Sequence, residues 1–363
     1  MTQKKWFWGI VAPVASISFS VLITSIILLI KGADVFGTYK TLWDFGIDPS
    51  NLVTEVNQTV AYYLAGVAAA IGFKMLLFNI GIDGQYRLAV FFSAVVGAQI
   101  HLPAILHVLV IMITAVSVGA LWAMIAGYLK VKRNISEVIS NIMLNTIASG
   151  LITYLLQPTR LGYNLPGSNN SETPPVPKSG WLPSFHVAGA NLYSYIFVAI
   201  AIGILYWVLL NKSVFGFNLR ATGMSFRAAR ASGINAPRMI FITMAISGGV
   251  AGLTGLGEMM GNTHNYSLSF PNGYALTGLA LALIGRSSPI GIALAAFFWS
   301  FLEGAAPALD LYGVPVEIVT VMQAIIIIST VVSYEIVKRI NLLQQQKLVG
   351  AAAAENTSKS EVK

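Results

Sequence analysis

Long apolar stretches separated by short polar ones recur along the whole chain. They cover residues 6–30, 60–78, 87–102, 104–129, 137–156, 191–210, 239–260, 273–285, 289–303 and 317–337. A membrane-spanning helix needs about 20 mostly apolar residues. The pattern therefore predicts an all-α polytopic membrane protein with about ten transmembrane helices, some of them short or broken. The stretches 273–285 and 289–303 are short for a full crossing, and we expect half-helices or a re-entrant pair there.

Composition and charge support this fold class and add an orientation. The chain is 56% hydrophobic and 10% charged, whereas a soluble domain has about 25% charged residues, so a soluble enzyme and a disordered chain are excluded. With the N-terminus in the cytoplasm, most of the 22 Lys and Arg residues fall on the cytoplasmic side. We therefore expect both termini in the cytoplasm, and we attribute the net charge of +8 to membrane orientation rather than to nucleic-acid binding.

Three connections are longer than the rest. Residues 31–58 are expected outside, and their apolar character is compatible with a position on the membrane surface. Residues 157–190, also outside, hold six prolines, which exclude a long helix. They form either an ordered loop of extended pieces or a flexible one.

The third connection, residues 211–238, is cytoplasmic and basic, and it contains no acidic residue. Ser225 can cap a helix of about two turns over 226–232, Gly233 suits the position after it, and Pro237 starts the next element. Helices this short are marginal alone and need a surface to pack on. The surface is either anionic lipid or a cytoplasmic partner.

Motifs for chemistry are missing from the sequence. The chain has no cysteine, no phosphate-binding G-x-x-x-x-G-K-[ST] loop and no metal-ligand spacing among its four histidines. We expect no catalytic residue, no metal and no cofactor. Glu258 and Glu303 are the acidic residues well inside late spans, which is fewer than an ion-coupled carrier usually needs. A secondary carrier is therefore the less favoured class.

Two segments resemble a known family. Residues 78–85 read FNIGIDGQ, and residues 216–223 read GFNLRATG, followed by AARASGI over 228–234. They are similar to the signature and coupling segment of bacterial ABC-transporter permeases in the branched-chain amino acid/simple sugar superfamily, in the branch assigned to nucleosides of the guanosine type. Residues 136–145 and 278–286 add weaker similarity in the same order. The sugar branch carries a Gly-Gly-Ile-Asp-Leu-Ser signature that is absent here, which favours nucleosides over sugars as substrates. A simple-sugar or amino-acid permease of the same fold is the alternative.

This resemblance implies an importer-permease fold and a set of partners. Residues 1–340 would be the transmembrane permease domain, with the coupling loop 211–238 inside it and a disordered cytoplasmic tail over 341–363. Cytoplasmic ABC ATPase subunits would hydrolyse ATP, an extracellular substrate-binding lipoprotein would deliver substrate, and a second permease subunit would complete a heterodimer in a bacterial plasma membrane. The residues expected to couple to the ATPase are Arg220, Gly223, Phe226, Arg227, Ala229, Arg230 and Gly233.

Polar residues near the FNIGIDGQ segment have two interpretations. Such side chains cannot face lipid cheaply. They either cap helices at a structural turn or line a translocation path, where amides and aromatic rings would suit a nucleoside. The path candidates are Asn79, Asp83, Gln85, Asn141, Asn145 and Glu258.

Overall fold

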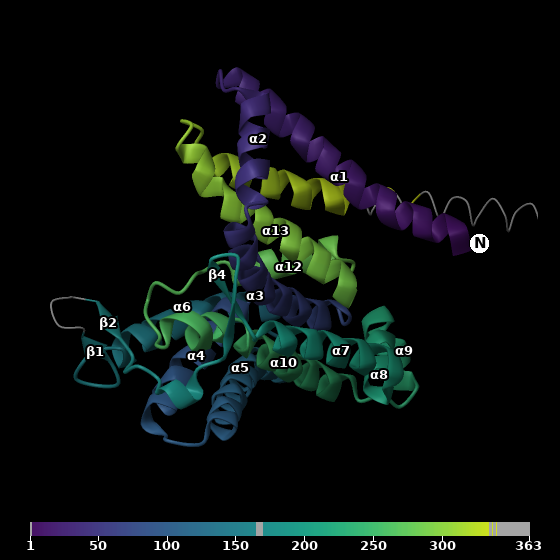
Figure 1. Ribbon diagram of the computed structural model, residues 1–363. Coiled ribbons are helices and arrows are strands. Elements are labelled where there is room, and N and C mark those ends of the chain that lie inside the picture. The colour runs from purple at the N-terminus through teal and green to yellow at the C-terminus, as the bar shows by residue number, and fades with distance from the viewer. Residues whose placement is uncertain (1, 165–169, 334–335, 337–338, 340–363) are drawn as a thin grey trace, which may run out of the picture. The chain divides into compact units, whose positions relative to one another are not determined.

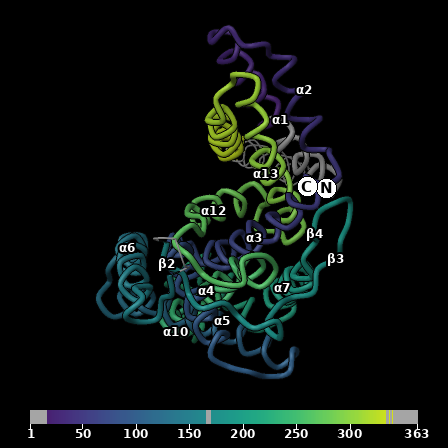
Figure 2. Tube along the Cα trace, turned by 60° about the vertical axis from the view of Figure 1, so that its left-hand side comes forward, coloured from purple at the N-terminus to yellow at the C-terminus, as the bar shows by residue number. Residues whose placement is uncertain are grey.

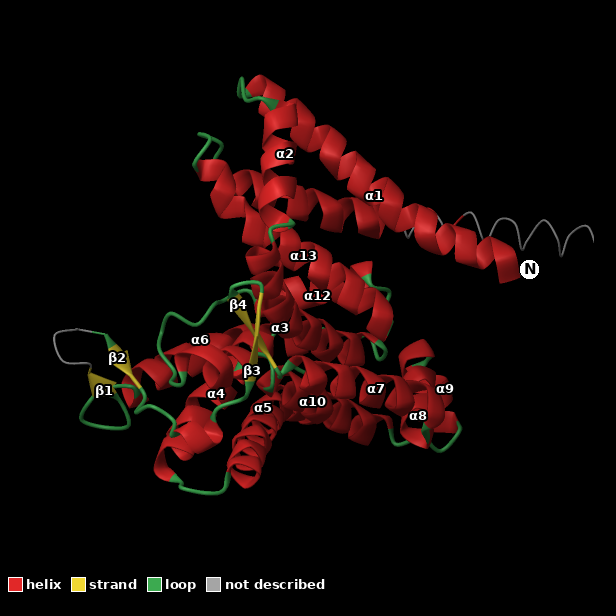
Figure 3. Cartoon of the chain, in the orientation of Figure 1, coloured by secondary structure: helices red, strands yellow, loops and turns green. Residues whose placement is uncertain are grey.

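The computed structural model describes residues 2–164, 170–333, 336 and 339. These residues are mostly helical, with two small β-hairpins (Figure 3). The chain divides into two compact units, residues 1–43 with 305–363, and residues 44–304. The predicted tail 341–363 lies outside the described residues.

The smaller unit is built from apolar helices near the two ends of the chain. It holds α1 (Thr2–Ile30), most of α2 (Val35–Gly46) and an apolar helix at Glu317–Ser333. The Ser20 hydroxyl donates to the Met322 carbonyl (2.9 Å), and the Ser329 hydroxyl donates to the Ser16 carbonyl (3.3 Å). These hydrogen bonds join α1 to the later helix and pair the buried hydroxyls of Ser20 and Ser329.

The larger unit contains the remaining helices, shown in Figures 1 and 2. They are α3 (Pro49–Phe73), α4 (Ile82–Gln99), α5 (Ala104–Arg133), α6 (Glu137–Leu155), α7 (Ile196–Lys212), α8 (Val214–Met224), α9 (Phe226–Ala231), α10 (Ala236–Gly252), α11 (Leu256–Glu258), a π-helical turn η2 (Met259–Thr263), α12 (Tyr274–Ile284) and most of α13 (Pro289–Asp310), whose residues from 305 onward belong to the smaller unit. Helix α10 packs on α5 and α3, α12 packs on α3, and α4 packs on α5. The core lies among α3, α4 and α10, where many side chains are fully buried.

Small residues allow α5 and α10 to pack closely. A Cβ atom added at Gly119 would lie 2.2 Å from the Gly248 carbonyl oxygen and 3.0 Å from the Gly252 Cα. Lipid tails are as apolar as the helix side chains, so the hydrophobic effect does not drive helices together within a membrane. Close van der Waals contacts between backbones stabilise the helix pair instead. The glycines of α5 and α10 therefore explain why this pair is the most extensive helix contact in the unit.

The proline-rich segment after α6 forms short extended pieces, as one of the two interpretations predicted. Strands β1 (Tyr163–Asn164) and β2 (Ser171–Glu172) pair antiparallel, and β3 (Ser184–Val187) pairs with β4 (Ala190–Tyr193). A single 3₁₀ turn, η1, covers Lys178–Gly180. The β3–β4 turn uses Ala188 and Gly189, both at positive φ (50° and 84°), as a tight two-residue hairpin requires.

Several predicted boundaries were wrong. Residues 31–58 are not a loop, because α2 and the first turns of α3 occupy them; Asp48 caps α3 through the Ser50 amide (3.0 Å) and Pro49 follows at its start. Residues 289–303 are not a half-helix, since α13 has 22 residues. The connection 211–238 holds α8 in addition to the predicted short helix.

Membrane-competent helices are present, but fewer than the apolar pattern predicts. Five helices of the described chain are long and apolar enough to cross a membrane: Pro49–Phe73, Ala104–Arg133, Glu137–Leu155, Ala236–Thr263 and Pro289–Asp310. A sixth span results if α7 and α8, bent by 70°, are counted together. Shorter apolar helices cover Ser16–Ile30, Tyr274–Ile284 and Glu317–Ser333.

Candidate functional site: a braced helix break, a polar cavity and a basic surface

The FNIGIDGQ segment covers the end of the break between α3 and α4 and the first turn of α4, and side-chain amides hold it in place. The Asn79 side chain is fully buried; its Nδ2 donates to Gln85 Oε1 (2.9 Å) and to Ser247 Oγ of α10 (2.8 Å). Gln85 Nε2 donates back to Asn79 Oδ1 (2.8 Å). This reciprocal pair leaves the amides satisfied in an apolar surrounding, where an unpaired one would cost about 1–3 kcal/mol.

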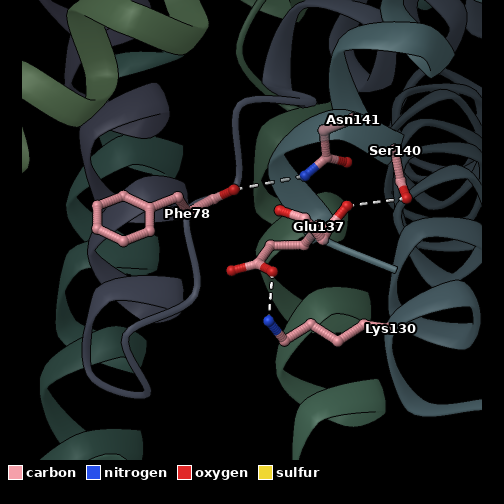
Figure 4. Close-up of polar contacts among 6 residues, drawn as sticks. Phe78, Lys130, Glu137, Ser140 and Asn141 are labelled. Atoms are coloured by element: carbon pink, nitrogen blue, oxygen red, sulfur yellow. Dashed lines mark hydrogen bonds and ion pairs between the residues drawn. The ribbon is translucent and has the colours of Figure 1, made fainter. Parts of the chain in front are cut away.

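Two asparagines of α6 hold the same break from the other side. Asn145 Nδ2 donates to the Ile80 carbonyl (2.9 Å), and its Oδ1 accepts from the Gly84 amide (2.9 Å). Asn141, fully buried, reaches the Phe78 carbonyl at 3.5 Å (Figure 4). The capping interpretation therefore accounts for the contacts of Asn79, Gln85 and Asn145, whereas the buried Oδ1 of Asn141 has no hydrogen-bond partner in the described part of the chain. The place of these four residues on a translocation path stays a prediction.

Asp83, in the first turn of α4, faces the beginning of α12. Its Oδ1 accepts from the Gly273 amide (3.1 Å) and the Ala275 amide (3.3 Å). A carboxylate is stabilised at a helix N-terminus, because the first amides have no partner within the helix. One turn later, Arg87 donates to Asn272 Oδ1 (2.9 Å). The N-terminal end of α4 thus holds residues 272–275 in place.

Tyr274 of this segment and Pro271 just before it border a polar cavity of about 500 Å³. Its walls come from α3, β4, the α10–η2 region and the segment before α12. The lining residues are Thr54, Asn57, Gln58, Val60, Ala61, Asn191, Tyr193, Thr254, Gly255, Gly257, Glu258, Asn262, Thr263, Ser269, Phe270, Pro271 and Tyr274. Among the predicted path residues Glu258 is in this lining; Asn79, Asp83, Gln85, Asn141 and Asn145 are not.

Hydrogen bonds arrange the polar groups of the cavity. Asn57 Nδ2 donates to the Asn191 carbonyl (2.7 Å) and its Oδ1 accepts from the Tyr193 amide (2.9 Å), so α3 holds strand β4. Asn262 Nδ2 donates to Glu258 Oε1 (2.7 Å) from η2. π-helical turns of this kind are frequent at functional sites.

Tyr193 keeps its phenolic proton at neutral pH. Burial raises the pKa of Tyr193 to about 12, and the nearby Glu258 charge contributes to the rise. The phenol can therefore donate a hydrogen bond to a bound solute, while Phe270 and Tyr274 offer ring faces. Asn57 and Gln58 were not predicted as site residues, because the sequence pattern placed them in a loop. The available signal was a pair of adjacent amide side chains just before an apolar stretch.

The predicted short helix is present and forms a basic surface with α8. Ser225 Oγ accepts from the Ala228 amide (3.2 Å), and Gly233 has φ +83°, so both ends follow the prediction. Arg227 and Arg230 are exposed, whereas Ala229 is buried against the chain itself. Ala229 is thus not available as a contact for a partner.

Helix α8 packs directly on the break between α3 and α4. A Cβ atom at Gly223 would lie 2.1 Å from the Lys74 carbonyl oxygen and 3.1 Å from the Met75 Cα. Arg220 donates to the Leu210 carbonyl of α7. Burial lowers the pKa of Lys74, and the Arg220 charge lowers it further.

The chain is similar to a known family over most of its length. Residues 51–331 match the family described as the permease component of branched-chain amino acid transport systems. The chain therefore belongs to this family of transporter permease components, and it is a membrane protein of the ABC permease type.

Particular relatives are similar over nearly the whole chain. The guanosine ABC transporter permease protein NupP of Bacillus subtilis is 32% identical over 336 residues, which are 90% of this chain and 94% of NupP. The nucleoside ABC transporter permease protein NupB of Lactococcus lactis is 30% identical, covering 90% and 91%. The glucose ABC transporter permease protein TsgB13 of Haloferax volcanii is 28% identical, covering 88% and 87%.

Proposed function

We propose that this chain is the transmembrane permease subunit of an ATP-binding cassette importer for nucleosides. The similarity to NupP over nine-tenths of the chain carries the proposal. The FNIGIDGQ segment and the α8–α9 surface lie within the matched residues 51–331. ATP hydrolysis belongs to partner subunits, since the chain has no nucleotide-binding loop of the P-loop type.

The polar cavity is the site that we assign to the passing nucleoside. Its volume of about 500 Å³ lies in the range of about 300–1,000 Å³ that small-molecule sites have. Glu258 and the amides of Asn57, Gln58 and Asn262 supply acceptors and donors for ribose hydroxyls and a base edge. Tyr274 supplies a ring face for the base.

Partners and topology complete the proposal. Cytoplasmic ATPase subunits bind the α8–α9 surface, a second permease forms a heterodimer with this chain, and an extracellular lipoprotein delivers substrate. The chain crosses a bacterial plasma membrane about ten times with both termini in the cytoplasm; this count includes the shorter apolar helices and α4.

Uptake measurements test the substrate class. Radiolabelled guanosine, adenosine, uridine, ribose and glucose would be offered to cells in which the permease is deleted and then restored. We expect nucleoside uptake to be lost on deletion and regained with the restored chain, while ribose and glucose uptake do not change. Loss of glucose or ribose uptake with normal nucleoside uptake would contradict the proposal.

The sugar alternative rests on one observation, the 28% identity to a glucose permease protein. The volume of the polar cavity is also large enough for a hexose. The same assay separates the two functions, because a hexose permease would leave nucleoside uptake intact.

A further inference from the structure

A leucine occupies a backbone position that normally favours glycine, at the point where α3 ends. The Leu77 amide donates to the Gly72 carbonyl (3.0 Å), and the Leu76 amide donates to the Phe73 carbonyl (3.0 Å). This pair of hydrogen bonds defines a Schellman motif, whose left-handed residue is usually glycine. Here it is Leu76, with φ +57°.

The Leu76 side chain gains no burial from this position. It is 69% exposed, whereas the flanking Met75 and Leu77 are 7% and 3% exposed. A buried leucine could offset backbone strain by packing, but an exposed one cannot. The fold of this chain alone therefore gives no reason for a leucine at residue 76.

Leu76 borders a groove of about 440 Å³ shared by four segments. One wall is the turn 75–77, the second is the end of α5 at Lys130, Val131 and Asn134, the third is 222–226, and the fourth is the start of α10 at Pro237 and Ile240. Met224 (88% exposed) and Phe226 (43% exposed) stand beside Leu76 on this groove. The proposed orientation places this turn on the cytoplasmic side, outside the lipid. An exposed apolar cluster in that position is typical of an interaction surface.

The exposed charged side chains around the groove are positive. Arg227 and Arg230 of α9 are exposed, and Lys132 and Arg133 end α5. The acidic residue on this side in the described chain is Glu137, which is 5% exposed and pairs with Lys130 (Figure 4). A partner that covers the groove must therefore bring acidic side chains around an apolar contact.

We propose that Leu76 is a contact residue for the partner ATPase, which places an apolar side chain flanked by acidic residues into the groove between the α3–α4 turn, the end of α5 and α8–α9. This inference rests on the proposed function, because it takes the cytoplasmic ATPase as occupant. It adds the α3–α4 turn to the α8–α9 surface as a second docking element. The ATPase then contacts directly the turn against which Gly223 packs.

The substitution Leu76→Gly tests this contact, because folding and docking predict opposite effects. Glycine is the favoured residue at φ +57°, so the variant should reach the membrane in normal amount, with a melting temperature equal to or above that of the native chain. If the side chain is a docking contact, the ATPase should co-purify about tenfold less well, as truncation of a central apolar contact typically gives. Nucleoside uptake should fall in parallel.

The control is Leu311→Gly, a leucine that is 83% exposed in another turn and that we expect on the outer side. This variant should keep ATPase retention and uptake. Leu76→Asn is a second variant, since asparagine tolerates left-handed backbone, and it should behave as Leu76→Gly does.

The outcomes separate the inference from the proposed function. Normal retention and uptake in Leu76→Gly, with loss in a charge-reversed Arg227→Glu/Arg230→Glu variant, would overturn the role of Leu76 and leave the importer intact. Absence of both Leu76 variants from the membrane would show that the side chain serves folding, which also overturns the proposal. Absence of nucleoside uptake in the native chain would instead contradict the proposed function.

Discussion

At the scale of single residues, buried side-chain amides supply the hydrogen bonds that hold the turn between α3 and α4. Asn79, Gln85 and Asn145 each use side-chain donors and acceptors on partners from other turns or helices. In an apolar environment such a network stabilises only when every member is paired.

Asn79→Ala should destabilise the chain strongly. It removes the partner of Gln85 and of the Gly81 amide, and each buried polar group left unpaired costs about 1–3 kcal/mol. Thermal unfolding in detergent would show a lower melting temperature. Asn211→Ala is the control, because Asn211 is exposed and its amide bonds within its own helix; equal melting temperatures for both variants would refute the network's role.

Gly223→Ala should disturb the contact between α8 and the turn after α3. The added methyl would meet the Lys74 carbonyl, so the two segments must separate, and we expect reduced uptake. Gly150→Ala is the matched control, since a Cβ at Gly150 of α6 meets nothing within 4 Å. Normal uptake in both variants, at equal membrane levels, would argue against a tight α8 contact.

At the scale of elements, the sequence predicts a helix correctly where the signals for its start and its end lie close together. The helix over 226–232 was predicted because its cap, its helix formers and its terminating glycine lie within nine residues. The start of α3 was missed although Asp48 and Pro49 signal it, because the apolar run begins only later. Helix α8 was missed because glycines at 216 and 223 weaken its propensity, while packing on α7 and the turn stabilises it.

Ser225→Ala should loosen α9 without unfolding the rest. Loss of an N-cap side chain costs about 1 kcal/mol, and α9 has six residues. Hydrogen exchange should therefore accelerate at the amides of 226–231 and stay unchanged in α10. Unchanged exchange in α9 would mean that packing of Ala229, not the cap, sets its stability.

At the scale of the whole molecule, the cavity could not be predicted from sequence. Its lining comes from four segments between residues 54 and 274, and nothing in their spacing shows that they meet. Glu258 was found because an acidic residue in an apolar run is conspicuous, whereas Asn57 and Tyr193 become neighbours only through the pairing of α3 with β4.

Glu258→Gln should weaken nucleoside handling while preserving the cavity. The amide keeps the size of the side chain but removes the negative charge that accepts from hydroxyl groups. We expect the concentration for half-maximal guanosine uptake to rise about tenfold, the effect of about 1.4 kcal/mol. Glu172→Gln, outside the cavity, should leave it unchanged; a normal value for Glu258→Gln would remove Glu258 from the proposed site.

Reporter fusions test the proposed orientation. A reporter inserted at Gly189, in the β3–β4 turn, should be active only outside the cell, and one inserted at Gly233 only inside. Both glycines have positive φ and nothing within 4 Å of a built Cβ, so insertions there should be tolerated. The same side for both reporters would contradict the orientation derived from the basic residues.

The reciprocal pairing of Asn79 with Gln85 also limits how this family can drift in evolution. Replacing one amide leaves the other buried without a hydrogen-bond partner, so single substitutions at either position should be selected against. Simultaneous replacement of both by apolar residues of similar volume should be tolerated. Alignments of related permeases should therefore show positions 79 and 85 covarying, with Ser247 following them through its bond to Asn79.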